Sequence, residues 1–301
     1  MSRTILTVTL NPSLDRTLIE NKKEIVYAGG KGINVARVLT NLGRPTVTTG
    51  IIGGYCAKEF EGFLSKERIR HQFLRMDAEV RTNLNIVSPH HSRIRILETG
   101  SVVDSDSLQK FVLHFKELLK NTSAVVLSGR NANGAPADFL AELILSAKKK
   151  NIPVVLDSSG EALKNGIKAK PWMIKPNFEE ACELAGSSLN SMEKLKKFCL
   201  SLNRKGVDVV IVSLWLKGAV ISCQDQVWYA KPPKVSAVND VGCGDALVAG
   251  FIHYFLKKHS LENSFRRSIG VGILQALSHD PRKIDFKKNR GIINAVSIKR
   301  I

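Results

Sequence analysis

The chain has 301 residues, of which 44% are hydrophobic and 24% are charged. This composition is typical of a globular protein and excludes wholesale disorder, and the length allows one large α/β domain. No stretch reaches the ~20 apolar residues that cross a membrane. The apolar run Ile5–Leu10 is short and contains threonines, so we expect no secretory signal and a cytoplasmic protein.

The net charge of +18 admits two interpretations: a nucleic-acid partner, or attraction of small anionic substrates by the summed field. The basic residues form short clusters, such as Lys148-Lys149-Lys150, rather than one tract. No nucleic-acid-binding motif accompanies them, so we expect neither a nucleic acid nor a membrane as partner. The five cysteines are scattered without a Cys-x-x-Cys pair, which predicts neither a zinc site nor a disulfide framework.

Apolar runs alternate with amphipathic stretches almost throughout the chain. The expected strands are Ile5–Leu10, Thr46–Ile52, Asn83–Val87, Ile94–Leu97, Ala124–Ser128, Pro153–Asp157, Trp172–Lys175, Val209–Ser213, Ala219–Ser222 and Val227–Ala230. The expected helices are Ile33–Leu42, Ala57–Arg68, Ser105–Leu119, Pro136–Lys149, Glu179–Ala185, Met192–Arg204, Asp245–Lys257 and a long pair after Leu261.

Two patterns among these elements predict the architecture. The β-branched runs Ala124–Ser128 and Pro153–Asp157 flank an expected helix and do not alternate with polar residues. Such runs indicate a parallel sheet covered by helices on both faces. Between Asn83 and Leu97, by contrast, apolar and polar residues alternate, which predicts a small accessory sheet with one solvated face.

A glycine-rich loop, Asp240-Val241-Gly242-Cys243-Gly244-Asp245, leads from an apolar segment into an expected helix. Its glycines permit close approach of a ligand, and the unpaired N–H groups of the new helix form an anion site. A carboxylate inside that site, Asp245, suits phosphoryl transfer, where it accepts the proton of the attacking hydroxyl. On this pattern alone, an ordinary acid in a first helical turn explains Asp245 equally well.

Two further segments have a composition suited to binding. Gly29-Gly30-Lys31-Gly32-Ile33-Asn34 places a lysine among glycines before a helix, so Lys31 could hold a phosphate. The segment has neither the Walker A spacing nor the dinucleotide fingerprint. Asp15 follows a strand and the Pro12 turn. Asp15 could bind sugar hydroxyls, although a solvated turn aspartate is the more common case.

Taken together and in this order, these segments resemble the PfkB/ribokinase carbohydrate kinase family over nearly the whole chain. Lys175–Glu180 is similar to the family's N-x-x-E element, and Ser213–Gly218 to its nucleotide-binding turn. The start of the chain through Asp15, with Asp157–Leu163 and Ala230–Pro233, resembles the 1-phosphofructokinase and tagatose-6-phosphate kinase branch.

The resemblance implies a ribokinase-like three-layer α/β/α fold with a mostly parallel central sheet. It implies one domain over 1–301, with small elements of a shortened β lid near 16–28 and 83–98. The implied activity is ATP-dependent phosphorylation of fructose 1-phosphate to fructose 1,6-bisphosphate, with Mg²⁺ as the metal. Tagatose 6-phosphate is the alternative substrate, and a catalytically impaired homologue with a binding or regulatory role is the alternative of another class.

The resemblance also implies residue roles. Asp245 is the implied general base, and Gly242, Cys243 and Gly244 the implied anion hole. The implied sugar-phosphate ligands are Asp15, Gly29, Gly30, Lys31, Asn34, Asn85 and Arg130. The implied ATP-binding residues are Lys175, Asn177, Ser213, Lys217, Gly218 and Gly244. Asn177 and Glu180 are implied to organise Mg²⁺ through water.

Two departures from the branch concern the sugar side. The segment between Asp15 and Gly29 is shorter than in the branch, which weakens the expected lid closure and the homodimer clasp that relatives build from it. Asn83 stands where the branch has an arginine that binds the sugar's phosphate. Arg81 is expected on the wrong strand face to replace that arginine, and Arg130 is the expected compensation.

Two more departures lie on the nucleotide side. Trp215 replaces a small residue, where it could stack on or block the base. Cys243 and Asp240 replace an alanine and a threonine of the glycine-rich loop. We expect the charge of Asp240 to raise the pKa of a neighbouring carboxylate or to weaken anion binding.

Overall fold

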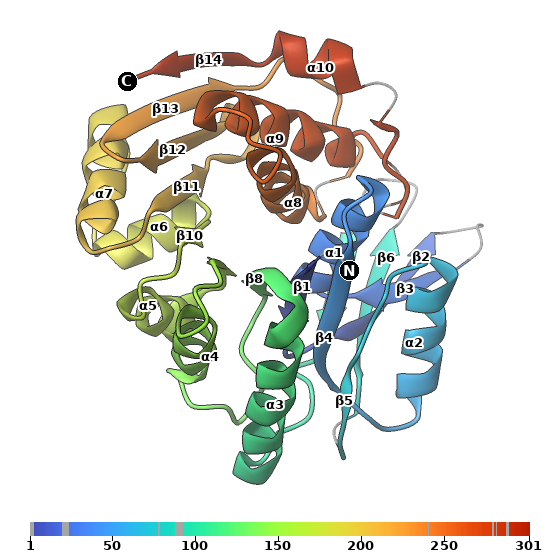
Figure 1. Cartoon of the computed structure of the whole chain (residues 1–301). Coiled ribbons are helices and arrows are strands. Elements are labelled where there is room, and N and C mark those ends of the chain that lie inside the picture. The colour runs from blue at the N-terminus through green and yellow to red at the C-terminus, as the bar shows by residue number, and fades with distance from the viewer. Residues whose placement is uncertain are drawn as a thin grey trace.

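The computed structural model describes residues 3–19, 24–77, 79–87, 93–239, 241–278, 280, 282–286 and 289–301. In this part of the chain a ten-stranded sheet has the order β14-β13-β12-β11-β10-β9-β8-β1-β4-β5 (Figure 1). Its strands are β1 Thr4–Thr9, β4 Thr46–Ile52, β5 Leu74–Arg75, β8 Thr122–Ser128, β9 Val154–Asp157, β10 Met173–Ile174, β11 Val209–Ser213, β12 Ala219–Cys223, β13 Gln226–Lys231 and β14 Ser297–Arg300. The strands from β11 to β5 are parallel to one another, and β12, β13 and β14 add antiparallel pairs.

Helices cover the main sheet on both faces, and successive strand residues supply the two resulting cores. Val125 and Leu127 of β8 belong to one core, together with residues of α3 Ser105–Leu118, α4 Phe139–Lys148, α5 Gly160–Lys168, α6 Phe178–Ala185 and α7 Met192–Arg204. Val126 belongs to the other core, with residues of α1 Lys31–Asn41, α8 Cys243–Phe255 and α9 Leu261–Ala276. This two-sided burial explains why the strands read as unbroken apolar runs, and it confirms the predicted three-layer, mostly parallel architecture.

A second sheet, of four strands, has the order β3-β2-β6-β7. Its strands are β2 Ser13–Ile19, β3 Ile25–Gly29, β6 Arg81–Val87 and β7 Arg93–Leu97. Figure 1 shows this small sheet beside α2 Cys56–Lys66, against which Leu14 and Ala28 pack. The alternation read from the sequence is present, but the apolar row is the exposed one: Ile94 and Ile96 are 58% and 54% exposed, whereas Asn83 is buried.

The local sequence pattern did not predict five elements, which are β2, β3, the two-residue β5, β14 and α5. Of these, β2 and β3 overlap the segment near 16–28 for which the resemblance implies a small β element. The expected long pair of helices after Leu261 was wrong in its second member. Only α9 is long, because α10 Asn289–Ala295 has seven residues and the chain then returns to the main sheet as β14. No helix among the described residues is long and apolar enough to cross a bilayer.

Candidate active site

The parallel strands deliver the polar residues to one edge of the main sheet. Asp157 ends β9, Ser213 ends β11, and Lys175 directly follows β10. The loop after β1 leads to Asp15, and α1 and α8 begin at the same edge, where Asn34 and Asp245 meet. Carboxyl ends of parallel strands are the usual ligand site of such sheets, because the loops there converge while the core holds them in place.

Asp245 lies in the first turn of α8 and is only 5% exposed. The residue before the helix, Gly242, is its N-cap; its φ of 78° is in the left-handed region that favours glycine, and it offers no side chain to cap the helix. The carboxylate of Asp245 instead accepts a hydrogen bond of 2.8 Å from Nδ2 of Asn34 on α1. Asp245 is therefore a first-turn acid and not the N-cap of α8, and its burial and its hydrogen bond with Asn34 distinguish it from a solvated acid at that position.

The surroundings of Asp245 make it an unusually basic carboxylate. Burial raises its pKa, and the negative charge of Asp157 raises it further. Lys31, Lys175 and the hydrogen bond from Asn34 act in the opposite direction, and the resulting pKa is about 6. Asp245 is thus ionised at neutral pH but close to the point at which it takes up a proton, which is what a general base requires.

Asp157 holds two lysines next to Asp245. Its Oδ1 lies 3.5 Å from Nζ of Lys31 and 3.3 Å from Nζ of Lys175, and Oγ of Ser128 donates to its Oδ2 at 3.2 Å. Burial favours the neutral form of Asp157, but the two lysine charges outweigh burial and keep its pKa below the ordinary value. The charge of Asp157 in turn raises the pKa of Lys31. Asp157 is therefore a fixed anion that keeps two cations in place.

The glycine-rich loop leaves room for these cations. A Cβ at Gly244 would lie 3.3 Å from Nζ of Lys175, so glycine lets the ammonium group approach the first turn of α8. Cys243 is the first residue of α8, and its Sγ donates to the carbonyl of Asn239 at 3.7 Å. Asp240 lies outside the described residues, so its expected effect on neighbouring charges stays a prediction.

Asp15 forms a second carboxylate centre, on strand β2 of the small sheet. Oγ of Ser13 and Nδ2 of Asn83 each donate to its Oδ1 at 2.8 Å. Burial raises the pKa of Asp15, against these hydrogen bonds and the charges of Arg81 and Arg37. A Cβ at Gly29 would overlap the Asp15 carboxylate, so the first glycine of the Gly29–Gly32 segment is needed for this packing.

Asn83 was not assigned a role from the sequence, although it contacts Asp15 directly. The expectation that Arg81 lies on the wrong face was wrong, because residues 81 and 83 of one strand point to the same side. Nη1 of Arg81 donates to Oδ1 of Asn83 at 3.3 Å and to the carbonyl of Glu98 at 2.9 Å. Burial, and after it the charge of Arg130, lowers the pKa of Arg81, while the charge of Asp15 raises it, so Arg81 lies within the electrostatic reach of both groups.

The structure does not bring Asn85 into this cluster. Asn85 pairs with Thr17 in the register of β2 and β6, two residues along from the pair formed by Asp15 and Asn83. No hydrogen bond joins Asn85 to the other predicted site residues within the described chain. The amide that reaches Asp15 is that of Asn83, two residues earlier on the same strand.

The N-terminus of α6 and the turn after β11 form the third part of the site. Asn177 caps α6: its Oδ1 accepts the N–H of Glu180 at 2.8 Å, and Oε2 of Glu180 accepts the N–H of Asn177 at 2.9 Å. The N–H of Ser213 donates to the carbonyl of Pro176 at 3.1 Å, which joins the turn to this cap. Gly218 has a φ of 101°, and a Cβ there would overlap the carbonyl of Ala230.

Trp215 is the aromatic residue of the turn between Ser213 and Gly218. It is 66% exposed and has a φ of 53°, which is rare for a bulky residue. Its indole Nε1 lies 3.3 and 3.2 Å from the two carboxylate oxygens of Glu179 in the first turn of α6. The backbone carbonyl of Lys217 accepts a hydrogen bond from the hydroxyl of Tyr229, which fixes the far side of the turn.

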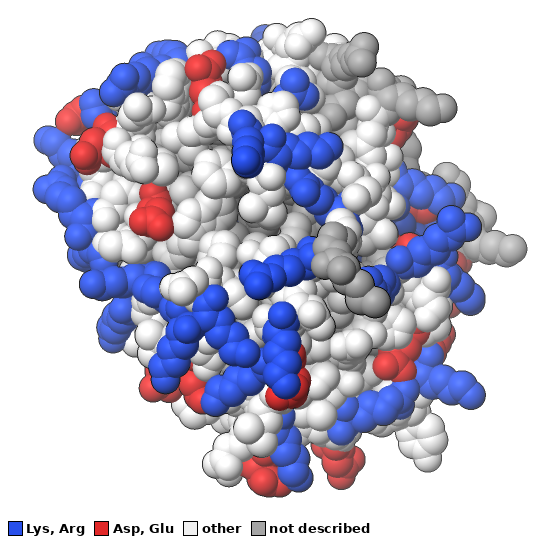
Figure 2. Space-filling view, in the orientation of Figure 1, with Lys and Arg blue, Asp and Glu red and all other residues white. Residues whose placement is uncertain are grey.

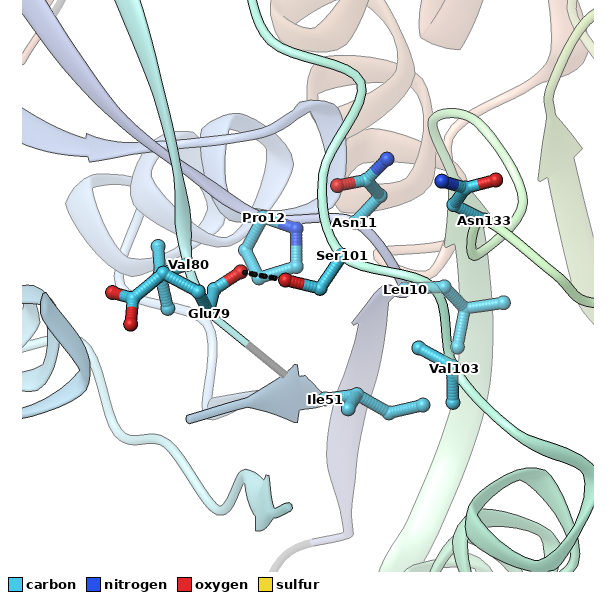
Figure 3. Close-up of a pocket in the computed structure, with 9 residues that line it drawn as sticks. All are labelled: Leu10, Asn11, Pro12, Ile51, Glu79, Val80, Ser101, Val103 and Asn133. Atoms are coloured by element: carbon cyan, nitrogen blue, oxygen red, sulfur yellow. Dashed lines mark hydrogen bonds between the residues drawn. The ribbon is translucent and has the colours of Figure 1, made fainter. Parts of the chain in front are cut away.

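A small cavity lies beside the sugar-side cluster but is too small for a sugar. It has a volume of about 20 Å³, which is room for about one water molecule. Figure 3 shows Leu10, Ile51 and Val103 on one side of it, and Asn11 and Asn133 on the other.

The chain matches known proteins along almost its whole length. A family model described as "pfkB family carbohydrate kinase" matches residues 4–285. Phosphofructokinase-2 from Escherichia coli in complex with potassium is 26% identical over 97% of this chain and 98% of that chain, with a TM-score of 0.90. The same enzyme with fructose-6-phosphate gives 25% identity, 97% and 98% coverage and a TM-score of 0.87.

A protein from Thermotoga maritima, described as a possible 1-phosphofructokinase, has 24% identity over 99% of both chains and a TM-score of 0.87. These similarities confirm the expected ribokinase-like fold. The family match covers the loop of Asp245, the Gly29–Gly32 segment and the cap formed by Asn177 and Glu180. The chain therefore belongs to the pfkB family of carbohydrate kinases.

Proposed function

We propose that this kinase transfers the γ-phosphoryl group of ATP to a hydroxyl of a ketohexose phosphate, and that fructose 1-phosphate is the substrate and fructose 1,6-bisphosphate the product. The observation that carries the proposal is the placement of Asp245. It is a buried carboxylate with a pKa of about 6 at the N-terminus of α8, near two lysines held by Asp157.

In the proposed reaction the sugar hydroxyl attacks the γ-phosphorus while its proton passes to the carboxylate of Asp245. The bond between the γ-phosphorus and its bridging oxygen breaks, and ADP leaves. The N–H groups of Gly242, Cys243 and Gly244 face the transferring group, and Lys31 neutralises the charge that spreads over its oxygens. Little covalent chemistry is required of the protein, because positioning and charge neutralisation supply the catalysis.

Mg²⁺ belongs to the proposal as a partner of the ATP phosphates. No group of three His, Cys, Asp or Glu side chains within the described residues could hold a metal ion. Mg²⁺ commonly keeps several waters and binds through substrate phosphates, so such a cage is not required. Oδ1 of Asn177 and Oε2 of Glu180 are engaged with the backbone of α6. The other carboxylate oxygen of Glu180, whose charge acts on Lys31, fits an indirect contact through water. When bound, Mg²⁺ would neutralise phosphate charge.

The sugar would be held by the cluster on the small sheet. Asp15 and Asn83 offer an acceptor and an amide to sugar hydroxyls, and Arg81 with Arg130 offers two guanidinium groups to the phosphate. Gly30, the N-cap of α1, and Asn34, in the first turn of that helix, are two further proposed contacts of the sugar phosphate. We keep tagatose 6-phosphate as the alternative substrate. The likeness to the phosphofructokinase-2 complex makes fructose 6-phosphate a second candidate.

The nucleotide would bind along the Ser213–Gly218 turn and the start of α6. Lys175, Lys217 and Gly218 are the proposed phosphate-side contacts, together with Gly244. The indole of Trp215 is exposed on this turn, and Trp215 is one of the four departures from the branch on which the impaired-homologue alternative rests. The intact network of Asn34, Asp157, Lys31 and Asp245 supports catalysis against that alternative, because all four groups are oriented by hydrogen bonds or ion pairs.

The small sheet is the proposed lid and the proposed homodimer surface. Its outer row exposes Leu18, Ile94 and Ile96, and large exposed apolar side chains on one face mark an interaction surface. The positive charge spread over the visible face in Figure 2 suits anionic substrates. We propose the cytoplasm as the compartment, where scattered cysteines stay reduced.

The test is a panel of fructose 1-phosphate, fructose 6-phosphate, tagatose 6-phosphate and the free hexoses, with ADP formation measured with and without Mg²⁺. We expect turnover that requires Mg²⁺ and is highest with fructose 1-phosphate. Highest turnover with a 6-phosphate would replace the proposed substrate but keep the kinase. Absence of turnover on every sugar, with no ATP binding, would overturn the proposal in favour of the impaired homologue.

A further inference from the structure

Arg37 and Glu67 form a buried ion pair next to Asn34, and neither residue has a role in the proposed function. Arg37 lies one turn after Asn34 on α1 and is only 3% exposed. Its Nε and Nη2 contact the two carboxylate oxygens of Glu67, which follows α2, and the Nη2 contact is 3.1 Å. Nη2 also donates to the carbonyl of Ala28 at 2.7 Å. The guanidinium plane is therefore held from two sides.

The remaining arm of Arg37 reaches the catalytic centre through Asn34. Nη1 donates to Oδ1 of Asn34 at 2.8 Å, and Nδ2 of the same amide donates to Asp245 at 2.8 Å. Glu67, Arg37, Asn34 and Asp245 are thus four groups joined by a continuous series of hydrogen bonds.

These hydrogen bonds fix the orientation of the Asn34 side-chain amide. An amide can turn about its last torsion and exchange its oxygen and nitrogen, and the two orientations differ only in their hydrogen bonds. A guanidinium group only donates and an ionised carboxylate only accepts. With Arg37 on one side and Asp245 on the other, only one orientation of Asn34 satisfies both neighbours.

We propose that the pair of Glu67 and Arg37 is a positioning element for phosphoryl transfer: it holds the Asn34 amide so that its N–H faces Asp245 and fixes the carboxylate for proton uptake. The inference rests on the proposed function, in which Asp245 is the base. Arg37 touches neither substrate nor reacting atoms in this account: it reaches Asp245 through Asn34, and its charge separately lowers the pKa of Asp15.

A purely structural role is the competing explanation, since α1 and α2 are joined by the pair. Buried ion pairs are often replaced by apolar residues with little loss of stability, so burial alone does not explain Arg37. The two explanations differ in what they predict for Asp245. The hydrogen bond from Asn34 lowers its pKa, whereas the other charged groups facing it are Lys31 of α1, Asp157 of β9 and Lys175 after β10. Those groups stay in place when Arg37 is replaced.

The test compares Arg37→Met with Arg266→Met in the full chain. Arg266 is a matched control, because it also joins a carboxylate, that of Glu262 at 3.0 Å, and a carbonyl, that of Val296 at 3.2 Å, but lies on α9. We expect Arg37→Met to lower kcat at pH 7 by about 10- to 100-fold and to move the acid limb of the pH–rate profile to higher pH. The KM for ATP should hardly change, and the control should stay within about twofold, as surface changes usually do.

Two further variants separate positioning from folding. Arg37→Lys keeps the charge but loses the planar fork, so we expect it not to restore the parent profile. Glu67→Gln keeps the shape and weakens the grip on Arg37, and we expect a smaller shift in the same direction; it serves as the measurement if Arg37→Met does not fold. In an Asn34→Ala background, Arg37→Met should cost little more, because the pathway through Asn34 is already broken.

Failure of this inference is distinguishable from failure of the proposed function. Titration of the Asp245 carboxyl carbon by ¹³C NMR reports its pKa without turnover, with Asp245→Asn used to assign the signal. A pKa and a rate profile unchanged in Arg37→Met, or losses that are equal in the parent and Asn34→Ala backgrounds, would overturn the positioning role. Retained turnover in Asp245→Asn would instead remove the base assignment, while the ¹³C titration would still test the contact through Asn34.

Discussion

Two carboxylates of the candidate site, those of Asp15 and Asp245, have different surroundings. Asp15 lies on the small sheet among a hydroxyl, an amide and two arginines, and two neutral donors share one of its oxygens. Asp245 lies at the start of a core helix beside Lys31 and Lys175, with a second carboxylate, Asp157, close by. Burial raises the pKa of both.

In the proposed function, this difference separates a binding group from a reacting group. The hydroxyl of Ser13, the amide of Asn83 and the carboxylate of Asp15 suit sugar hydroxyls, and in that proposal Arg81 binds the phosphate that the sugar already carries rather than the transferring group. Around Asp245, cations and a helix N-terminus converge where phosphoryl charge would build up, and a neighbouring anion keeps the base ready to accept a proton. Environment, rather than residue type, assigns the two roles, as in other enzymes that use paired carboxylates.

After the loss of the carboxylate of Asp245 itself, the largest expected effect in this comparison comes from Lys31→Met. Lys31 pairs with Asp157, and its charge also acts on Asp245. Its loss leaves Asp157 with one lysine and the transferring phosphoryl group with less positive charge around it. We expect kcat to fall by about 10²- to 10³-fold, the usual cost of removing a donor to transition-state charge. Steady-state kinetics with varied ATP and sugar measure this. Lys110→Met, on the exposed face of α3, is the control, and a change confined to KM would show that Lys31 only binds.

A smaller and different effect is expected for Asp15→Asn. The change keeps the shape but removes the anion that accepts from Ser13 and Asn83, so sugar binding should weaken. We expect the KM for the sugar phosphate to rise by about 10- to 100-fold, with a lesser change in kcat, because two hydrogen bonds to a charged group are affected. Sugar-dependent kinetics at saturating ATP measure it. A fall in kcat with an unchanged KM would erase the contrast between the two carboxylates.

The smallest effect concerns stability and its dependence on pH. Above pH 6 the folded protein keeps Asp245 ionised although its pKa has been raised from 3.8 to about 6, so burial of this charge lowers the free energy of unfolding. As the pH falls through 6 the folded state takes up the proton before the unfolded state does, and the penalty disappears. Asp245→Asn should therefore raise the melting temperature at pH 8, by about 2–4 °C, and raise it less at pH 5. A gain that grows toward low pH would contradict the assignment.

Much of the fold could be predicted because local pattern and burial agree. β11 and α7 have the expected bounds, since an unbroken β-branched run and a clear helical periodicity leave no competing structure. The local pattern did not predict β2 because this strand, one face of which contributes to the site, is rich in polar residues. It did not predict α5 because that helix begins at Gly160, a residue of low helix propensity. β14 forms only because a partner edge, β13, is available.

The site was predictable where one segment carries the chemistry and unpredictable where two segments meet. The loop of Asp245 and the segment of Lys31 have their own glycine signatures. Asn83 contacts Asp15 only through the pairing of β2 with β6, which no local pattern reports. Asp157 ends an apolar strand, and a carboxylate there was a signal that could have been followed to Lys31 and Lys175.

Single-turnover phosphoryl transfer in Asp245→Asn tests the central claim most directly. The variant is mixed with saturating ATP, Mg²⁺ and the preferred sugar phosphate from the substrate panel, and formation of the bisphosphate is followed beside an independent measurement of the Kd for ATP. The account predicts that transfer falls by about 10³-fold or more, while ATP binding stays within a few-fold of the parent. Transfer at a rate close to that of the parent would contradict the claim that Asp245 is the base.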